Sequence, residues 1–290
     1  MADEPVFSSP WISAPAYQIV IGTQGLNAEA MQALVSRQFK PLPGAPAFYY
    51  LSTDHLWSAP WQILSAYMHE AHAPVTMLVA IIPGANVPQE REIGFHLRPW
   101  HEIDAVASHL WLAEALQDQR LLSFMQRVVD ARGKQIGYEA FARIEQVNGE
   151  VVGGGAIMEA SRALRIEYQL DRMMHKQAIL NYVEGDLEGY LFINFLTGFI
   201  HRPEVYLEGL SQAVSRHSIL TRFIVLDIPV ADYSADSAKL KAIAQYCRSR
   251  GFAIALDDVT STQGLESLLT EVRPGFVKLD AKIGRMPSPA

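Results

Sequence analysis

The stretch Gly137-Tyr138-Glu139-Ala140-Phe141-Ala142-Arg143 decides the fold, because polar residues at the ends of later apolar segments form one pattern with its Glu139 and Arg143. An Asn ends the apolar segment Leu191–Asn194, and an acid ends the segment Phe223–Asp227. Paired acids end the segment Ala253–Asp258, and Lys278 lies at the end of a fourth segment. Each segment is short, continuously apolar and rich in β-branched residues, which is typical of a strand buried on both faces. Polar groups at the carboxyl ends of parallel strands converge at the mouth of a β/α barrel, so the pattern predicts an α/β fold with a site there.

Composition excludes several classes of protein. With 49% hydrophobic and 19% charged residues, the chain has the composition of a well-cored globular protein. The formal net charge of −7 argues against a protein that binds DNA through its phosphate backbone, which needs a surplus of Lys and Arg. A small anionic ligand, held by local cations and metal, stays compatible with this charge.

Three features of the sequence bear on the cellular location of the protein. The lone Cys247 excludes an intramolecular disulfide framework and fits a reducing cytosol. The start, Met1–Pro5, is acidic where a targeting segment is basic. The apolar stretch Val75–Ile82 is too short to span a bilayer. We therefore expect a cytoplasmic protein with no membrane span.

The first hundred residues alternate strand and helix signals, and the order βαβαβ predicts a small α/β domain of unknown role over residues 1–98. Its elements are a strand at 17–21, a helix at 27–39, a strand at 47–51, a helix at 58–72 and a strand at 75–82. A long helix with a broad apolar face, from about His101 to near Phe124, is expected to connect this domain to the rest over residues 99–123.

Residues 124–290 follow a different pattern. Two strands flank the turn Arg132-Gly133-Lys134, and a helix from about Glu159 to Val183 precedes further strand–helix alternations. The predicted strands lie at residues 125–130, 135–143, 190–194, 222–228, 252–256 and 276–279.

At these residues the chain resembles the EAL family, whose domains bind and hydrolyse the bacterial second messenger cyclic di-GMP (c-di-GMP). The match runs from about Gln126 to Ile283 and agrees in order, spacing and identity with the family's Glu-Ala-Leu-Leu-Arg signature, Asn strand, Leu-Glu-Ile strand, double-Asp strand and Lys strand. The resemblance implies a (β/α) TIM-like barrel. The matching segments are Glu139–Arg143, Leu191–Asn194, Leu226–Ile228, Ala255–Asp258 and Phe276–Asp280.

The resemblance also implies a metal-dependent phosphodiesterase site. Family members hold one or two Mg²⁺ or Mn²⁺ ions with carboxylates and an amide oxygen, the hard ligands that such ions prefer. Bound metals polarise a phosphodiester and generate a hydroxide near neutral pH. By resemblance, Glu139, Asn194, Asp227, Asp257 and Asp258 would be metal ligands, Glu139, Asp258 and Lys278 would be catalytic, with Lys278 orienting the attacking water, and Arg143 would contact a ligand phosphate.

Taken one at a time, these residues have plain structural readings. Glu139 could be a surface acid, Asn194 a turn residue at a strand end, and Asp257-Asp258 a pair of helix caps. Their joint order, with Lys278 in place, favours an inherited site.

Three substitutions depart from the family pattern. Asp227 stands where the family has Glu, which withdraws the carboxylate by roughly 1.5 Å, and Mg²⁺ demands near-ideal octahedral geometry. The segment Val259–Gln263 replaces a Phe-Gly-Thr-Gly loop that couples the metal site to dimerisation in the family, and its glycine is gone. Phe141 replaces the signature leucine, which we interpret as a packing change.

The chain after Leu121 is also shorter than the about 200–250 residues of a β/α barrel. We therefore expect an incomplete barrel over residues 124–290 that lacks its last two strands, which in the family carry another metal-site Glu and a ligand-facing Gln. An open barrel exposes two strand edges. A homodimer, a partner protein or another element of the chain would cover the gap, unless the sequence is a truncated product of a longer gene.

Three functions are compatible with these features. The first is a catalytically impaired cyclic di-GMP receptor or regulator, favoured by the retained Glu139, Arg143, Asn194 and Lys278 beside the altered loop. The second is an active Mg²⁺- or Mn²⁺-dependent phosphodiesterase that produces linear pGpG. The third is a protein-interaction remnant without nucleotide binding.

Overall fold

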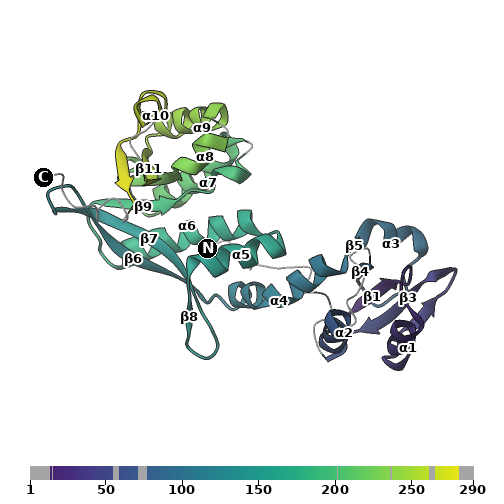
Figure 1. Cartoon of the computed structure of the whole chain (residues 1–290). Coiled ribbons are helices and arrows are strands. Elements are labelled where there is room, and N and C mark those ends of the chain that lie inside the picture. The colour runs from purple at the N-terminus through teal and green to yellow at the C-terminus, as the bar shows by residue number, and fades with distance from the viewer. Residues whose placement is uncertain are drawn as a thin grey trace, which may run out of the picture. The chain divides into compact units, whose positions relative to one another are not determined.

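The computed structural model describes residues 14, 16–54, 59–70, 77–200, 202–235, 237–260 and 265–280. Its contacts divide the chain into two compact units, and Figure 1 shows the elements of both. The first unit comprises residues 1–120 and 158–165, and the second comprises residues 121–157 and 166–290. None of the described helices is both long and apolar enough to cross a membrane.

The first unit is built on a five-stranded sheet with the order β2-β3-β1-β4-β5. Every pair of neighbours in this sheet is antiparallel. The alternation of strands and helices over residues 17–83 is as predicted, with β2 as an additional short strand, whereas the antiparallel pairing does not follow from the order of elements. The strands are β1 (Tyr17–Gly22), β2 (Lys40–Leu42), β3 (Ala45–Thr53), β4 (Leu78–Pro83) and β5 (Leu97–Pro99).

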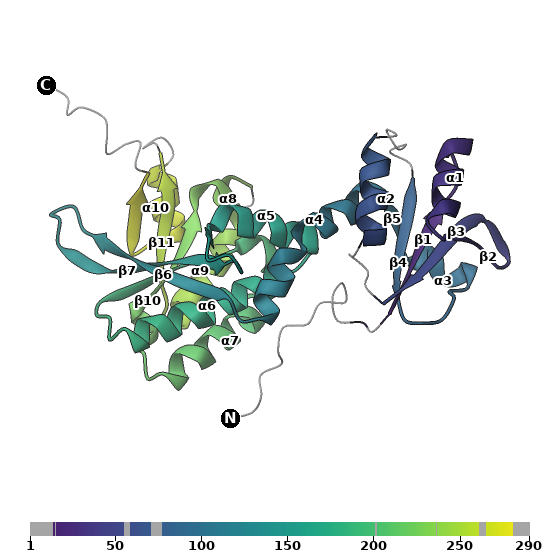
Figure 2. The same cartoon turned by 90° about the horizontal axis from the view of Figure 1, so that it is seen from below.

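Helices cover both faces of this sheet, with α1 and α2 on one face and α3 on the other (Figure 2). Successive strand residues point to opposite faces, so Ile19 packs in one cluster with Leu34 of α1, and Val20 packs in the other with Ile93 of α3. Asn27 caps α1, because its Oδ1 accepts the Ala30 N–H at 2.8 Å. The helices are α1 (Ala28–Ser36), α2 (Ala59–Glu70), α3 (Glu90–His96) and α4 (Trp100–Gln117).

Two long predicted helices are shorter or interrupted in the structure, and the helix predicted to run through Phe39 ends at Ser36. The helix expected to run to near Phe124 ends at Gln117, and residues 121–124 belong to β6. Gln119 there has a left-handed φ of 57°, which stops the helix. The single helix predicted over residues 159–183 is two helices, α5 (Gly154–Leu164) and α6 (Glu167–Glu184), separated at Arg165, which also has a φ of 57°.

The second unit is built on a seven-stranded sheet with the order β12-β11-β10-β9-β7-β6, in which β8 pairs with β7. The strands β7, β9, β10, β11 and β12 pair in parallel, and β6 forms an antiparallel hairpin with β7. All six predicted strands are present within a few residues, and β8 is additional. They are β6 (Leu121–Val129), β7 (Gln135–Glu145), β8 (Val151–Val152), β9 (Tyr190–Asn194), β10 (Ile224–Pro229), β11 (Ala253–Val259) and β12 (Phe276–Leu279).

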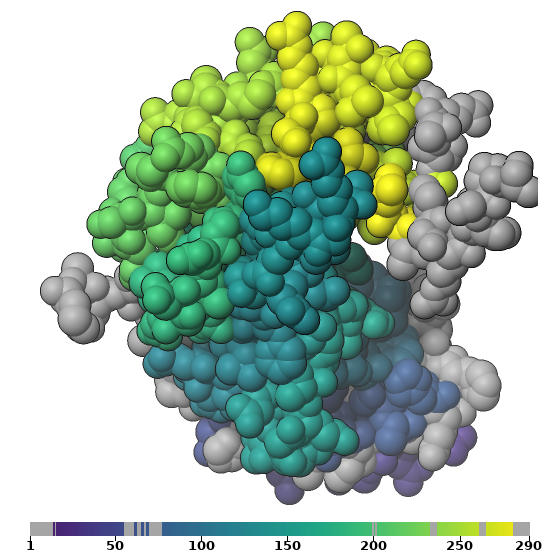
Figure 3. Space-filling model, turned by 90° about the vertical axis from the view of Figure 1, so that its left-hand side faces the viewer, coloured from purple at the N-terminus to yellow at the C-terminus, as the bar shows by residue number. Residues whose placement is uncertain are grey.

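One face of the parallel strands packs against helices. Leu191, Leu226 and Leu256 lie on that face in one apolar cluster with Leu207 of α7 and Ile243 of α9. Figure 3 shows the surface of this unit, where the residues of α10 and β12 (yellow) and of the β6–β7 hairpin (teal) are exposed. The remaining helices are α7 (Pro203–Arg216), α8 (Val230–Ala235), α9 (Ser237–Ser249) and α10 (Leu265–Val272), with 3₁₀ turns at Thr197–Phe199 and Thr221–Phe223.

The opposite face of the same strands carries Phe192, Val225 and Ala255 in a smaller cluster. Glycine at position 137 allows β7 to approach β9 closely, because a Cβ at Gly137 would lie 2.0 Å from the carbonyl oxygen of Tyr190. Most of the substituted segment Val259–Gln263 lies outside the described residues.

Candidate functional site

Side chains alternate between the two faces of a strand, and this alternation determines which polar groups of the parallel strands share a face. Asp227 pairs with Asn194 on one side and with Ala255 on the other, in parallel register. Glu139 pairs with Phe192, whose side chain lies in the smaller cluster. Because residues two apart point to the same face, Asn194, Asp227 and Asp257 follow Phe192, Val225 and Ala255 onto this face.

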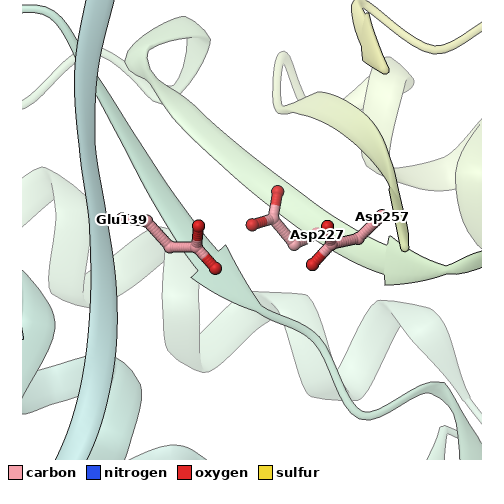
Figure 4. Close-up of side chains that lie close together, drawn as sticks. All are labelled: Glu139, Asp227 and Asp257. Carbon is pink, nitrogen blue, oxygen red and sulfur yellow. The ribbon is translucent and has the colours of Figure 1, made fainter. Parts of the chain in front are cut away.

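Three carboxylates meet there. Glu139, Asp227 and Asp257 each offer an oxygen, and these oxygens lie within 4.8 Å of one another. Figure 4 shows the three side chains pointing toward one another from β7, β10 and β11. Lys278 of β12 joins them: its Nζ lies 2.8 Å from Glu139 Oε2, 2.7 Å from Asp227 Oδ2 and 3.1 Å from Asp257 Oδ2. We call these four residues the acidic cluster.

Burial controls the charge of the acidic cluster. Asp227 is 0% exposed, and this burial raises its pKa to about 7, although the ammonium of Lys278 opposes the shift. Burial likewise raises the pKa of Glu139. Burial alone would lower the pKa of Lys278, but the charges of Asp227 and Glu139 outweigh it and raise the pKa. One ammonium therefore faces three acids, and their full ionisation leaves excess negative charge.

The acidic cluster fits a divalent cation. Asp227 Oδ1 is buried and has no hydrogen-bond partner among the described residues, whereas buried polar atoms are normally paired. Lys278 contacts the other oxygen of that carboxylate. Carboxylate oxygens are the ligands that Mg²⁺, Mn²⁺ and Ca²⁺ prefer. A cation beside Asp227 Oδ1 would satisfy this atom and offset the excess charge.

Asp258 does not join the acidic cluster. Asp258 is exposed and has a φ of 56°. Its backbone N–H donates to Asp257 Oδ1 at 2.9 Å. The left-handed backbone interrupts the strand alternation, and the pairing of β11 with β12 shifts register between Leu256 and Val259. The structure therefore brings together Glu139, Asp227, Asp257 and Lys278. Asp258 is not one of the acids whose oxygens lie within 4.8 Å of one another, although its charge contributes to the raised pKa of Glu139.

Asn194 and Arg143 flank the acidic cluster in different ways. Asn194 follows Phe192 on the same face of β9, and its Nδ2 lies 3.5 Å from the Ala140 carbonyl oxygen. Arg143 lies four residues beyond Glu139 on β7, roughly 13 Å along the strand. Its guanidinium lies over the rings of Phe124 and Phe141, 5.6 and 5.7 Å from their centroids. Phe141, at the position of the signature leucine, therefore packs against this arginine.

A buried network behind β9 did not emerge from sequence reasoning. The Nε2 of His175 donates to the backbone oxygen of Asn194 at 3.0 Å, which fixes the proton on Nε2 because a carbonyl only accepts. The carboxylate of Asp171 lies 3.5 Å from the same nitrogen and accepts from the Tyr206 hydroxyl. Burial raises the pKa of Asp171 to about 6. The sequence carried one signal for this network. Asp171 and His175 are four residues apart and therefore lie on the same side of α6, among its apolar buried residues.

The sequence pattern of the EAL domain family matches residues 109–286 of the chain. The chain belongs to the EAL domain family. A curated relative is the EAL-domain-containing protein YkuI of Bacillus subtilis, which is 24% identical over 174 residues. That alignment covers 59% of this chain and 42% of YkuI, so the chain matches less than half the length of this relative.

Solved structures of EAL proteins share the fold. The FimX EAL domain of Xanthomonas citri in complex with c-di-GMP superposes with a TM-score of 0.57 at 20% identity, over 66% of this chain and 76% of that one. The FimX EAL domain of Pseudomonas aeruginosa bound to c-di-GMP gives 0.54 at 19% identity, over 62% and 73%. YkuI in complex with c-di-GMP and calcium gives 0.51 at 21% identity, over 64% and 46%. At these identities the likeness shows the fold, a mixed α/β EAL fold.

Proposed function

We propose that this chain is a cyclic di-GMP receptor or regulator of the EAL type whose capacity for hydrolysis is impaired. The observation that carries the proposal is the acidic cluster, in which one carboxylate oxygen each of Glu139, Asp227 and Asp257 lies within 4.8 Å of the others. Structural neighbours of the same fold are bound to c-di-GMP, and one of them also holds calcium. In this proposal residues 124–290 form an incomplete TIM-like barrel that acts in the cytoplasm, and segment 99–123 joins it to a separate domain at 1–98.

The chain's own residues take the following roles in this proposal. Glu139, Asp227 and Asp257 hold one Mg²⁺ or Mn²⁺ ion together with Asn194, and Lys278 offsets part of the negative charge of the carboxylates. Arg143, stacked on two aromatic rings, presents a guanidinium to a ligand phosphate. A bound ion would supply Lewis-acid polarisation of the phosphodiester.

The position of Asp258 supports binding without efficient turnover. By family resemblance this residue would serve a second metal or the attacking water, yet Asp258 is exposed and is not among the acids whose oxygens lie within 4.8 Å of one another. Asp227 is shorter than the family's Glu by one carbon. A site with one complete ion position would bind the nucleotide and lack the paired-ion clamp on the attacking and leaving oxygens.

An active phosphodiesterase is the second candidate, favoured by the contact of Lys278 with all three carboxylates. In that case Lys278 would orient a water and the product would be linear pGpG. The two candidates differ in turnover and agree on the ligand.

Isothermal titration calorimetry of cyclic di-GMP into the chain with Mg²⁺, followed by chromatography of the nucleotide, separates the candidates. A receptor gives saturable heat and intact cyclic di-GMP. Sustained heat with linear pGpG that disappears in Glu139→Gln establishes the enzyme instead. Absence of heat would contradict both candidates and favour the third function, a protein-interaction remnant without nucleotide binding.

Matched variants test the assigned contacts. Arg143→Ala should weaken nucleotide binding by about 10- to 100-fold, since it removes a charge-assisted contact to phosphate. Arg132→Ala removes the same charge from the exposed turn of the β6–β7 hairpin and should leave affinity unchanged. Equal loss in both variants would point to general electrostatics and would argue against the Arg143 contact.

A further inference from the structure

The first unit contains a cavity of 430 Å³ that plays no part in the proposed cyclic di-GMP site. This volume lies within the about 300–1,000 Å³ typical of small-molecule sites. All of its lining residues belong to the first unit. They come from the end of β4, the α3–β5 segment, the first turns of α4 and the last turn of α5 with Arg165.

The polar part of the lining is cationic, although the chain as a whole carries a net charge of −7. Arg98, Arg162, Arg165 and His96 line the cavity with one acid, Glu102. The acid is already paired, since Glu102 Oε2 lies 3.2 Å from Arg165 Nη2. The cavity therefore keeps two guanidinium groups, those of Arg98 and Arg162, that its own carboxylate does not neutralise.

These two arginines are available to a ligand. Arg98 Nη1 donates to the backbone oxygen of Leu97 at 2.7 Å, which orients the guanidinium and leaves its charge uncompensated. Arg162 is exposed and forms no ion pair within the part of the chain that the structure describes. A guanidinium is a planar fork of donors that suits carboxylate, sulfonate or phosphate oxygens.

The remaining wall is apolar. Ile81, Ile103, Val106 and Leu164 contribute buried side chains, each at most 5% exposed. A hydrated inorganic anion would contact the arginines and leave the apolar wall in contact with water. A neutral hydrocarbon would cover the wall and leave the two guanidinium groups without an anion. A ligand that satisfies both parts has an apolar body and one anionic group.

We propose that this cavity binds an amphipathic organic anion, with its carboxylate, sulfonate or phosphate group on Arg98 and Arg162 and its apolar body against Ile103, Val106 and Leu164. The site belongs to the first unit, shares no residue with the acidic cluster, and needs neither metal nor cyclic di-GMP.

Two fluorescent probes of nearly the same shape test this pairing of charge and apolar surface. The probe 8-anilino-1-naphthalenesulfonate carries an anionic group on an aromatic body, and N-phenyl-1-naphthylamine is its neutral counterpart. Titrated into the full chain, the sulfonate should saturate and bind about tenfold more tightly than the neutral amine. Its affinity should also fall as NaCl is raised, because the arginines are partly exposed.

Variants assign the binding to this cavity. Arg162→Gln should weaken the sulfonate probe about tenfold and leave the neutral probe unchanged. Arg91→Gln removes the same charge from an exposed position of α3 outside the cavity and should change neither affinity. Ala105→Phe fills the cavity and should weaken both probes.

Three results would overturn the proposal. One is equal affinity for the two probes. Another is the same sulfonate affinity in Arg162→Gln and Arg91→Gln. The third is release of the sulfonate by excess cyclic di-GMP with Mg²⁺, which would place the probe at the acidic cluster of the second unit. Because the probes are read without metal, failure here leaves the calorimetric test of the proposed function untouched.

Discussion

The two sheets of this protein bury different kinds of polar group. Within the described residues, the first unit buries only neutral polar side chains, among them Gln18, whose amide contacts Ser52 Oγ at 2.6 Å and the Gly84 oxygen at 3.1 Å. The second unit buries Glu139, Asp171, Asp227 and His175. Burying charge costs far more free energy than burying a paired amide. The buried carboxylates of the second unit therefore lower its stability at the face where they converge.

Strand direction explains where those groups meet. In the antiparallel first sheet, neighbouring strands end at opposite edges, so groups at strand ends are spread over both. In the second sheet, β7, β9, β10, β11 and β12 run parallel. Groups near their carboxyl ends share one edge, and a residue pair such as Asp227 and Asn194 is placed side by side by register alone.

The largest effect should come from Lys278→Met. Removal of the ammonium leaves three carboxylates without their shared cation, and breaking a buried ion pair costs about 3–5 kcal/mol. Denaturant unfolding at pH 8 with metal chelated should show this loss, and Mg²⁺ should restore part of it. Lys241→Met, at an exposed position of α9, should shift stability by less than about 0.5 kcal/mol. A midpoint for Lys278→Met equal to that of the parent chain would contradict the buried charge cluster.

Asp227→Asn should change how stability depends on pH. The pKa of Asp227 rises from 3.8 to about 7 on burial, so the folded state holds a proton in this window that the unfolded state has lost. The free energy of unfolding of the metal-free chain therefore falls as the pH rises from about 4 to about 7, by a few kcal/mol. Asp227→Asn should flatten this fall in urea titrations from pH 4 to 8.

The same carboxylate sets the pH dependence of metal binding with the opposite sign. Mg²⁺ requires ionised Asp227, so its affinity should rise with pH through about 7. Asp54→Asn, an exposed acid of the first unit, should alter neither profile. Parallel stability curves for Asp227→Asn and the parent chain would refute the raised pKa.

Glycines test the packing of the two sheets. Gly137→Ala should destabilise the second unit by about 1–3 kcal/mol, because its Cβ would lie 2.0 Å from the backbone oxygen of Tyr190. In the first sheet Gly22→Ala brings a Cβ only to 3.6 Å from the Leu78 oxygen, an ordinary contact. Gly155→Ala in α5 meets no atom within 4 Å and should be neutral or slightly stabilising. Thermal unfolding ranks the three variants, and a tolerated Gly137→Ala would show that β7 and β9 can separate.

The smallest effect should come from the network behind β9. His175→Leu removes the donor to the Asn194 carbonyl and should weaken Mg²⁺ affinity about tenfold. His175→Gln keeps an N–H donor and should recover part of that affinity in a metal titration. His109 of α4 makes a similar contact, 2.7 Å from the Ala105 oxygen, in the first unit. His109→Leu should leave metal affinity unchanged. An equal loss of Mg²⁺ affinity in His175→Leu and His109→Leu would contradict a positioning role for His175.

Much of the second unit could be predicted from sequence, because its strands are short apolar segments bounded by polar groups. The strands at Tyr190–Asn194 and Phe276–Leu279 match their predicted limits. Helix ends were less predictable: Arg165 and Gln119 adopt left-handed conformations that no local sequence preference requires. The apolar residues 121–122 continue a helical pattern, and only their pairing with Ile144 and Arg143 places them in a strand.

The sequence by itself determined which residues could form the acidic cluster, since strand alternation and family pattern depend on local order alone. The tertiary structure decided that Glu139, Asp227, Asp257 and Lys278 meet, and that Asp258 adopts a left-handed backbone and is exposed. It also decided the burial that raises the pKa of Asp227, the His175 contact behind β9 and the cationic cavity of the first unit. Burial, register and cavity shape depend on residues far apart in the chain, so no local pattern encodes them.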